Sequence, residues 1–348
     1  MKCQSPRVNK TASESRCSFG NSILCWSDWS SSLYKYKMIQ AFWKAIKVEN
    51  IPSPYDTIQL KVFYPADRDK APFPVVIFFS GINCNLAMYE WLAIELASRG
   101  MVVILFNWLA ENIPGQIALT PGVNLAAFAL DVYGTIPTAS ALPSLLAELE
   151  RLNRSGELAG LLDLQKIILG GHSAGGRVAL ENANPQLFSQ VAAAFSYGGH
   201  TAAPIQLGYE PGTILSLPNS APMLLIGGTQ DGVIANNAQS YGIERWETAA
   251  TPVERTFREA IVREEDDSYL VVLEGANHFS ISDRPDPTLR VTALDLPTTQ
   301  PPAKIRSVMA EIVGLFIDLQ VRDRATASQQ LELFIENNNS LIASFESK

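Results

Sequence analysis

The amino-acid sequence predicts an α/β protein built on a mostly parallel, doubly wound sheet flanked by helices. Short runs rich in β-branched residues alternate along the chain with segments of helix length, which is the pattern of strand–helix–strand units. One run, residues 74–79 (PVVIFF), is apolar throughout, as expected of a strand buried on both faces. With 348 residues, 47% of them hydrophobic, the chain is long and apolar enough for one large core.

The first elements follow from their local patterns. Residues 55–66 (YDTIQLKVFYPA) alternate apolar and polar side chains, which predicts an antiparallel strand near the sheet edge. After the strand at 74–79, residues 86–99 have a helical pattern that Gly100 ends. Residues 101–106 (MVVILF) are apolar throughout and predict the next buried strand.

The same alternation continues to the end of the chain. Short apolar runs predict further strands at 166–169, 191–195, 222–227 and 269–275. Amphipathic segments predict helices at 142–153 and 302–320, and a helical C-terminal tail over 326–348.

Two segments do not fit the alternation. Residues 107–141 are rich in Leu, Ala, Ile, Pro and Gly, and residues 283–301 are rich in proline. We expect both to be loops at the C-terminal edge of the sheet, where open α/β sheets place their sites. Long loops are uncommon without a role, so we expect 107–141 to form a pocket wall; alternatively, it only covers the core.

Charge and cysteine usage exclude several classes of function. The net charge of −8 disfavours nucleic acid and anionic lipid as partners. No apolar stretch reaches the roughly 18 residues of a membrane-spanning helix. The four cysteines lack the spacing of a zinc site or a disulfide framework. We therefore expect a cytoplasmic protein that acts on a small molecule.

Residues 1–37 differ from the rest of the chain. They are rich in serine and basic residues, and Glu14 and Asp28 are their only acids. They lack the apolar core of a secretory signal peptide. Two interpretations remain open: a plastid transit peptide, or a misannotated start with translation beginning at Met38, which we favour. In both cases we expect this segment to lie outside the fold.

The motif that points to chemistry is KIILGGHSAGG, residues 166–176, in which Gly171, Ser173 and Gly175 form a G-x-S-x-G pattern. A predicted strand precedes it and a helical pattern follows, as a nucleophile elbow requires. A serine on so tight a turn projects its hydroxyl above the strand ends, and the glycines avoid β-carbons that would clash across the turn. The alternative is an ordinary glycine-rich turn.

A serine hydroxyl needs an adjacent base, and the chain has three histidines. His172 lies inside the elbow, and we expect it to point away from Ser173 and to support the turn. His200 follows the next strand and is expected to be a loop residue or to line the pocket. His278, in GANHFSI after the last parallel strand, is the expected general base.

The residue expected to orient the histidine is Asp231, which follows a predicted strand in GGTQDGVI. The order Ser, Asp, His along the chain is the order that suits an elbow of this kind. Glu274 and Asp283 are alternatives near His278.

Acyl transfer also needs hydrogen-bond donors for an oxyanion. The backbone N–H of Ala174, next after the serine, is one expected donor. The backbone N–H of Ile82, in the loop after strand 74–79, is the other. We leave open whether Asn83 adds a donor or caps the helix that follows.

The segments FFSGIN, GGHSAGG, IGGTQDGVI and GANHFSI, in this order, resemble the α/β-hydrolase superfamily over about residues 55–322. The chain is most similar to the branch of chlorophyllases, cutinases, plasma-type platelet-activating-factor acetylhydrolases and dienelactone hydrolases. It departs from these at Ser80, where many relatives carry His-Gly-x; at Ala174, where chlorophyllases carry Arg; and at Ser173, where dienelactone hydrolases carry Cys. The resemblance implies one α/β-hydrolase domain over 38–325.

The resemblance implies a carboxylic ester hydrolase that works through an acyl-enzyme and needs no metal or organic cofactor. The low charge of segment 107–141 favours an apolar, chlorophyllase-like or lipase-like ester as substrate. An acyltransferase or amidase with the same triad is an alternative, and a non-catalytic binding protein on a hydrolase fold is another. A dinucleotide-binding enzyme is disfavoured, because no G-x-G-x-x-G follows the first strand.

Overall fold

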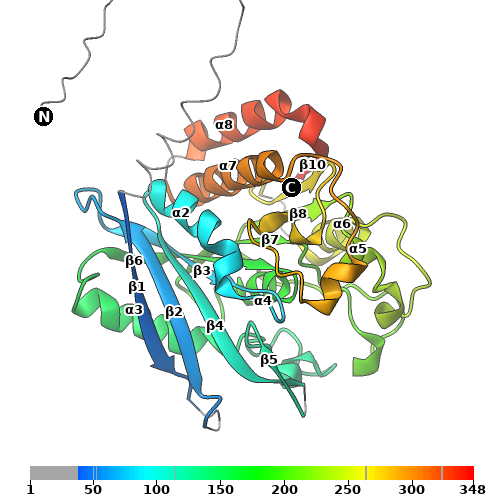
Figure 1. Ribbon diagram of the computed structural model, residues 1–348, viewed down its shortest axis with the longest axis horizontal. Helices are drawn as coiled ribbons and strands as arrows, with labels where there is room; N and C mark the ends of the chain where they lie inside the picture. The colour runs from blue at the N-terminus through cyan, green and yellow to red at the C-terminus, as the bar shows by residue number, and fades with distance from the viewer. Residues whose placement is uncertain (1–37, 50, 52, 114, 263–264, 323) are drawn as a thin grey trace, which may run out of the picture.

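The computed structural model describes residues 38–348 except 50, 52, 114, 263–264 and 323. Residues 1–37, for which a leader or a misannotated start is expected, lie outside this part of the chain. The described residues form an α/β fold with a mostly parallel, mixed ten-stranded sheet flanked by helices (Figure 1). The predicted fold class is confirmed at this level.

Parallel strands form the centre of the sheet and antiparallel strands form its edges. The strands that pair in parallel are, in spatial order, β4 (Val102–Ile113), β3 (Phe73–Phe79), β6 (Leu162–His172), β7 (Val191–Tyr197), β8 (Met223–Gly228) and β9 (Tyr269–Leu273). At one side of the sheet, β4 is followed by β2 (Thr57–Pro65) and then by β1 (Ile39–Lys47). At the other side, β9 is followed by β10 (Ile342–Ser347). A further strand, β5 (Gln116–Leu119), forms a hairpin with the end of β4.

Two apolar cores cover the two faces of the sheet. Successive side chains of a strand point to opposite faces, so Val75 and Ile77 of β3 belong to one core and Val76 and Phe78 to the other. The first core also contains side chains from α3 (Leu142–Arg154), α4 (Ala174–Asn182) and α6 (Thr251–Arg255). The second contains side chains from α2 (Glu90–Ser98), α7 (Pro302–Val321) and α8 (Arg324–Asn337).

The structure differs from the sequence prediction at the first edge of the sheet. β2 is antiparallel, as predicted for 55–66, but the edge strand is β1, which pairs with β2 along its whole length. The segment 107–141 was predicted to be a loop, yet it begins as the end of β4 and continues through β5. β1 and this hairpin have many exposed positions, so they lack the continuous apolar run that marks a central strand.

The sequence predicted a C-terminal tail that is helical throughout, and this prediction is wrong. Helix α8 is followed by β10, which pairs with β9, and the ring of Phe345 stacks on that of Tyr269 with centroids 6.0 Å apart. β10 covers the edge of β9, which would otherwise present unpaired backbone groups. A strand of six residues is too short for its periodicity to stand out from a fraying helix.

No helix within the described ranges is both long enough and apolar enough to cross a membrane.

Deletion of residues 338–348 should destabilise the protein, because it removes β10 and exposes the edge of β9. We expect thermal unfolding to shift down by about 5 °C or more, with increased aggregation, as measured by calorimetry and light scattering. Leu333→Ala on α8 is the control, because that side chain is 50% exposed and should leave Tm nearly unchanged. An unchanged Tm in the truncated chain would contradict a structural role for β10.

Candidate active site

Ser173 lies in the turn between β6 and α4, with φ 56° and ψ −124°. A positive φ is unfavourable for a residue with a β-carbon, so this turn is strained. The N–H of Ser173 donates to the carbonyl of Tyr197 at 2.9 Å, and its own carbonyl accepts from the N–H of Arg177 at 3.0 Å. The turn is therefore held on one side by β7 and on the other by the first turn of α4.

Two glycines allow the turn to form. A β-carbon on Gly171 would lie 2.2 Å from the carbonyl oxygen of Gly175, and one on Gly175 would lie 2.2 Å from the carbonyl oxygen of Phe79. Backbone atoms cannot move away as the end of a flexible side chain can. The close approach of β6, α4 and β3 therefore requires glycine at both positions, for the steric reason anticipated from the sequence.

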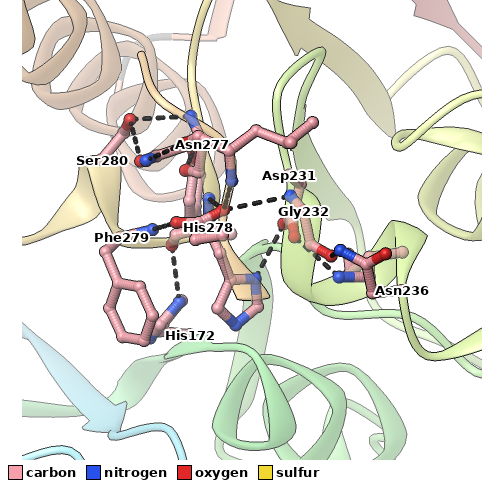
Figure 2. Close-up of polar contacts among 12 residues, drawn as sticks. His172, Asp231, Gly232, Asn236, Asn277, His278, Phe279 and Ser280 are labelled. Atoms are coloured by element: carbon pink, nitrogen blue, oxygen red, sulfur yellow. Dashed lines mark hydrogen bonds and ion pairs between the residues drawn. The ribbon is translucent and has the colours of Figure 1, made fainter. Parts of the chain in front are cut away.

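His278 and Asp231 come together beyond the carboxyl ends of β9 and β8. Nδ1 of His278 lies 2.8 Å from Oδ2 of Asp231 (Figure 2). The other carboxylate oxygen of Asp231 accepts from the N–H of Ile234 at 2.9 Å. Both side chains are almost fully buried. Of the alternative acids, Asp283 is paired with a different side chain: its Oδ2 lies 3.8 Å from Nε of Arg284.

Burial and charge act in opposite directions on His278. Burial disfavours the charged imidazole and lowers its pKa, whereas the negative charge of Asp231, the hydrogen bond to it and the charge of Asp295 raise it. The net effect raises the pKa of His278 above its ordinary value. The arrangement is thus suited to hold a proton gained during a reaction.

Asp295 is a residue of this site that the sequence analysis missed. Its carboxylate accepts hydrogen bonds from the N–H groups of Gly232 at 3.0 Å, His278 at 3.1 Å and Phe279 at 3.1 Å. It therefore ties the loop that carries Asp231 to the loop that carries His278. It lies in the proline-rich segment 283–301, where nothing in the sequence marks one aspartate as a partner for distant backbone amides.

A buried hydrogen-bond chain connects the loop after β3, the elbow and the His278 loop. Nε2 of His172 lies 3.0 Å from the carbonyl oxygen of His278 (Figure 2). A carbonyl only accepts, so Nε2 carries the proton and Nδ1 accepts from the hydroxyl of Tyr89 at 2.8 Å. The same hydroxyl accepts from the N–H of Gly81 at 3.3 Å. His172 thus supports the turn, and burial, followed by the proximity of His278, keeps its pKa well below the ordinary value.

The loop after β3 presents Ile82 beside the serine. Ile82 and Ala174 line the same cavity as Ser173, and no described residue accepts a hydrogen bond from the N–H of Ile82. The loop is held by the N–H of Asn83, which donates to the carbonyl of Leu119 in β5 at 2.8 Å. Asn83 has φ 62° and does not cap the next helix.

The helical turn that follows this loop is capped by Asn85, whose side chain accepts from the N–H of Ala87 at 2.9 Å. The suggestion that Asn83 is this cap is therefore wrong. Asn83 takes a left-handed backbone conformation, which asparagine tolerates better than most residues, and Asn85 has the extended backbone of an N-cap.

Ser173 and His278 open into one cavity of about 360 Å³, a volume within the usual range for small-molecule sites. Segment 107–141 contributes Val123, Leu125 and Phe128 to its wall, so the second part of this segment lines a pocket as expected. His200 also lines the cavity. Its other lining residues are Ile82, Ala174, Arg177, Val178, Gly198, Pro204, Leu207, Val233, Ile234, Asn237 and Tyr241.

No protein-family model matches this chain, and none of the curated proteins matches it. Among the residues that the structure describes, no group of three or more His, Cys, Asp or Glu side chains is arranged to hold a metal ion. The functional interpretation therefore depends on the geometry of Ser173, His278 and Asp231.

Tyr89→Phe should lower the free energy of unfolding by about 1–3 kcal/mol, because it leaves Nδ1 of His172 and the N–H of Gly81 without a partner in a buried place. Urea denaturation measures the change. Tyr55→Phe is the matched control, since the Tyr55 hydroxyl forms no hydrogen bond to any described residue. Equal stability of the two variants would show that the Tyr89 hydroxyl does not hold these elements together.

Proposed function

We propose that this chain is a serine hydrolase that cleaves carboxylic esters, with Ser173 as nucleophile, His278 as general base and Asp231 as the acid that orients it. The observation that carries the proposal is that two side chains line the same cavity: Ser173, which has a strained backbone, and His278, which is hydrogen-bonded to the carboxylate of Asp231. The sheet is mostly parallel, and Ser173 lies in the turn between a strand and the helix that follows it. Both features are compatible with an α/β-hydrolase fold.

The first chemical step follows from the tautomer of His278. Because Asp231 accepts a hydrogen bond from Nδ1, the proton of the neutral imidazole resides there and Nε2 is left as the base. Nε2 takes the hydroxyl proton of Ser173 as the serine oxygen attacks the ester carbonyl. The imidazolium that forms is stabilised by Asp231 and, through its charge, by Asp295.

The negative charge of the tetrahedral intermediate needs prearranged donors. In this proposal the N–H groups of Ile82 and Ala174 are those donors, and the N-terminus of α4 adds its favourable dipole. His278 then protonates the leaving alcohol, and the acyl group stays on Ser173. A water molecule activated by the same histidine releases the acid.

The cavity favours substrates with an apolar portion. Ile82, Leu125 and Leu207 line it and are each more than a third exposed, so apolar side chains continue from the cavity onto the surface.

A chain-length series of p-nitrophenyl esters should therefore show faster hydrolysis of medium acyl chains than of acetate. Preference for acetate alone would contradict this part of the proposal.

Ser173→Ala should reduce hydrolysis of p-nitrophenyl butyrate by about 10⁴-fold or more, because no other hydroxyl takes over the attack. Its Tm should stay within a few degrees of the wild-type value. A fluorophosphonate probe should label the unaltered protein and the exposed-site control Ser155→Ala, but not Ser173→Ala. Retained activity in Ser173→Ala would remove the nucleophile assignment.

The rate of ester hydrolysis should fall at acidic pH, and the midpoint of this fall should lie above pH 6.5, the ordinary pKa of histidine. Only neutral His278 can act as base, so activity is lost as pH drops through its pKa, and a raised pKa moves that loss to higher pH. The pH profile of kcat/KM measures the midpoint.

Asp231→Asn should lower this midpoint and reduce kcat by about 10³–10⁴-fold. Asp295→Asn should lower the midpoint less, because Asp295 acts on the imidazole by charge without a side-chain hydrogen bond to it. An Asp231→Asn protein with full activity and an unshifted profile would refute the assignment of the acid.

A further inference from the structure

The cavity beside Ser173 is not apolar throughout. His200, Arg177, Tyr241 and Asn237 also line it. The rings of His200 and Tyr241 meet edge to face with centroids 5.2 Å apart, and the side-chain amide of Asn237 donates to the Tyr241 hydroxyl at 3.5 Å. The mechanism proposed above uses none of these groups, so their presence in the wall calls for another role.

His200 provides a hydrogen-bond donor without a protein acceptor. The residue is 9% exposed, and its Nδ1 accepts from the N–H of Ala202 at 3.3 Å. The proton of the neutral ring therefore resides on Nε2. No described residue accepts from Nε2, and this nitrogen is not fully enclosed by protein atoms.

His200 is unsuited to act as a second base. Burial first, and then the positive charge of Arg177 and the proximity of His278, lower its pKa to about 3. The ring therefore stays neutral and keeps its single N–H over the whole range in which an esterase is assayed. A donor of fixed protonation is suited to recognition of an acceptor atom.

Arg177 brings a positive charge to this end of the cavity, partly offset by its ion pair with Glu181. Its Nε donates to Glu181 at 2.7 Å and its Nη1 to the carbonyl of Ala202 at 2.8 Å, while its guanidinium lies 4.7 Å from the ring centroid of Phe128. Among the described residues that line this cavity, Arg177 is the only one with a permanent charge, and Glu181 lines a different one. The positive charge of Arg177 still acts on His200, since it is one of the causes that lower the pKa of that ring.

We propose that the natural ester carries a second oxygen acceptor, a carbonyl or carboxylate oxygen separate from the scissile ester, which accepts from Nε2 of His200 in the field of Arg177. This inference rests on the proposed esterase function and specifies its substrate class. The apolar walls bind the hydrocarbon part of the substrate, and the acceptor fixes its direction in the cavity. Simple alkyl esters leave this N–H without a partner and are poorer substrates.

The test compares p-nitrophenyl 4-oxopentanoate and 5-oxohexanoate with the matched pentanoate and hexanoate, each rate divided by its hydroxide-catalysed rate. A p-nitrophenyl half ester of adipate, corrected by a Ser173→Ala blank, distinguishes a carboxylate from a carbonyl acceptor. We expect kcat/KM to favour at least one acceptor-bearing ester by about tenfold, the size expected of one buried hydrogen bond.

Variants of the protein show whether the preference for acceptor-bearing esters depends on His200. His200→Phe should bring the ratio of acceptor-bearing to alkyl ester to about one, and His200→Gln, which keeps an N–H donor, should restore part of it. Val123→Ala is the control, because it enlarges the cavity without changing a donor and should leave the ratio as it is. If His200→Phe does not fold, inhibition of the unaltered protein answers the question: 4-oxopentanoate should inhibit more strongly than pentanoate.

The outcomes separate this inference from the proposed function. Equal rates for the paired esters in the unaltered protein, or a ratio that His200→Phe leaves unchanged, would overturn the acceptor site while hydrolysis itself still supports an esterase. Failure to hydrolyse any of these esters would instead overturn the proposed function.

Discussion

The geometry of the site depends on a backbone approach that only glycine permits. Where β6 turns into α4, the β-carbon missing from Gly175 would overlap the carbonyl of Phe79 in β3. This contact brings the first turn of α4 against the neighbouring strand, and Ser173, at the start of that helix, has a positive φ of 56°. The serine thus stands above the ends of the parallel strands, at the edge where the loops after β3, β8 and β9 also meet.

The convergence of these loops is maintained by hydrogen bonds that cross between them. Tyr89 and His172 connect the loop after β3 to the carbonyl of His278, and Asp295 connects the Asp231 loop to the N–H of the same residue. His278 is therefore held at its backbone from two directions and at its ring by Asp231. Such support keeps a side chain in one orientation without requiring a rearrangement during reaction.

The parts of the site that the sequence predicted are those that depend on strand order. Ser173, Asp231 and His278 each follow a recognisable buried strand, and the carboxyl ends of parallel strands meet at one edge. Tyr89 and Asp295 were not predictable in the same way, because Tyr89 binds the ring of the distant His172 and Asp295 accepts from backbone amides that are distant along the chain. Edge strands β1 and β10 were missed for a related reason: their pairing depends on neighbours rather than on their own periodicity.

The three histidines show why burial alone does not determine the role of a residue. All three are buried, and burial lowers the pKa of each. Only His278 faces carboxylates, and their charge reverses the effect of burial. His172 and His200 face hydroxyl, amide or cationic groups and stay neutral, so each keeps one donor and one acceptor nitrogen. One side-chain type therefore supports a turn at His172 and, in the roles proposed above, carries a proton at His278 and offers a hydrogen-bond donor at His200, according to the charge of its neighbours.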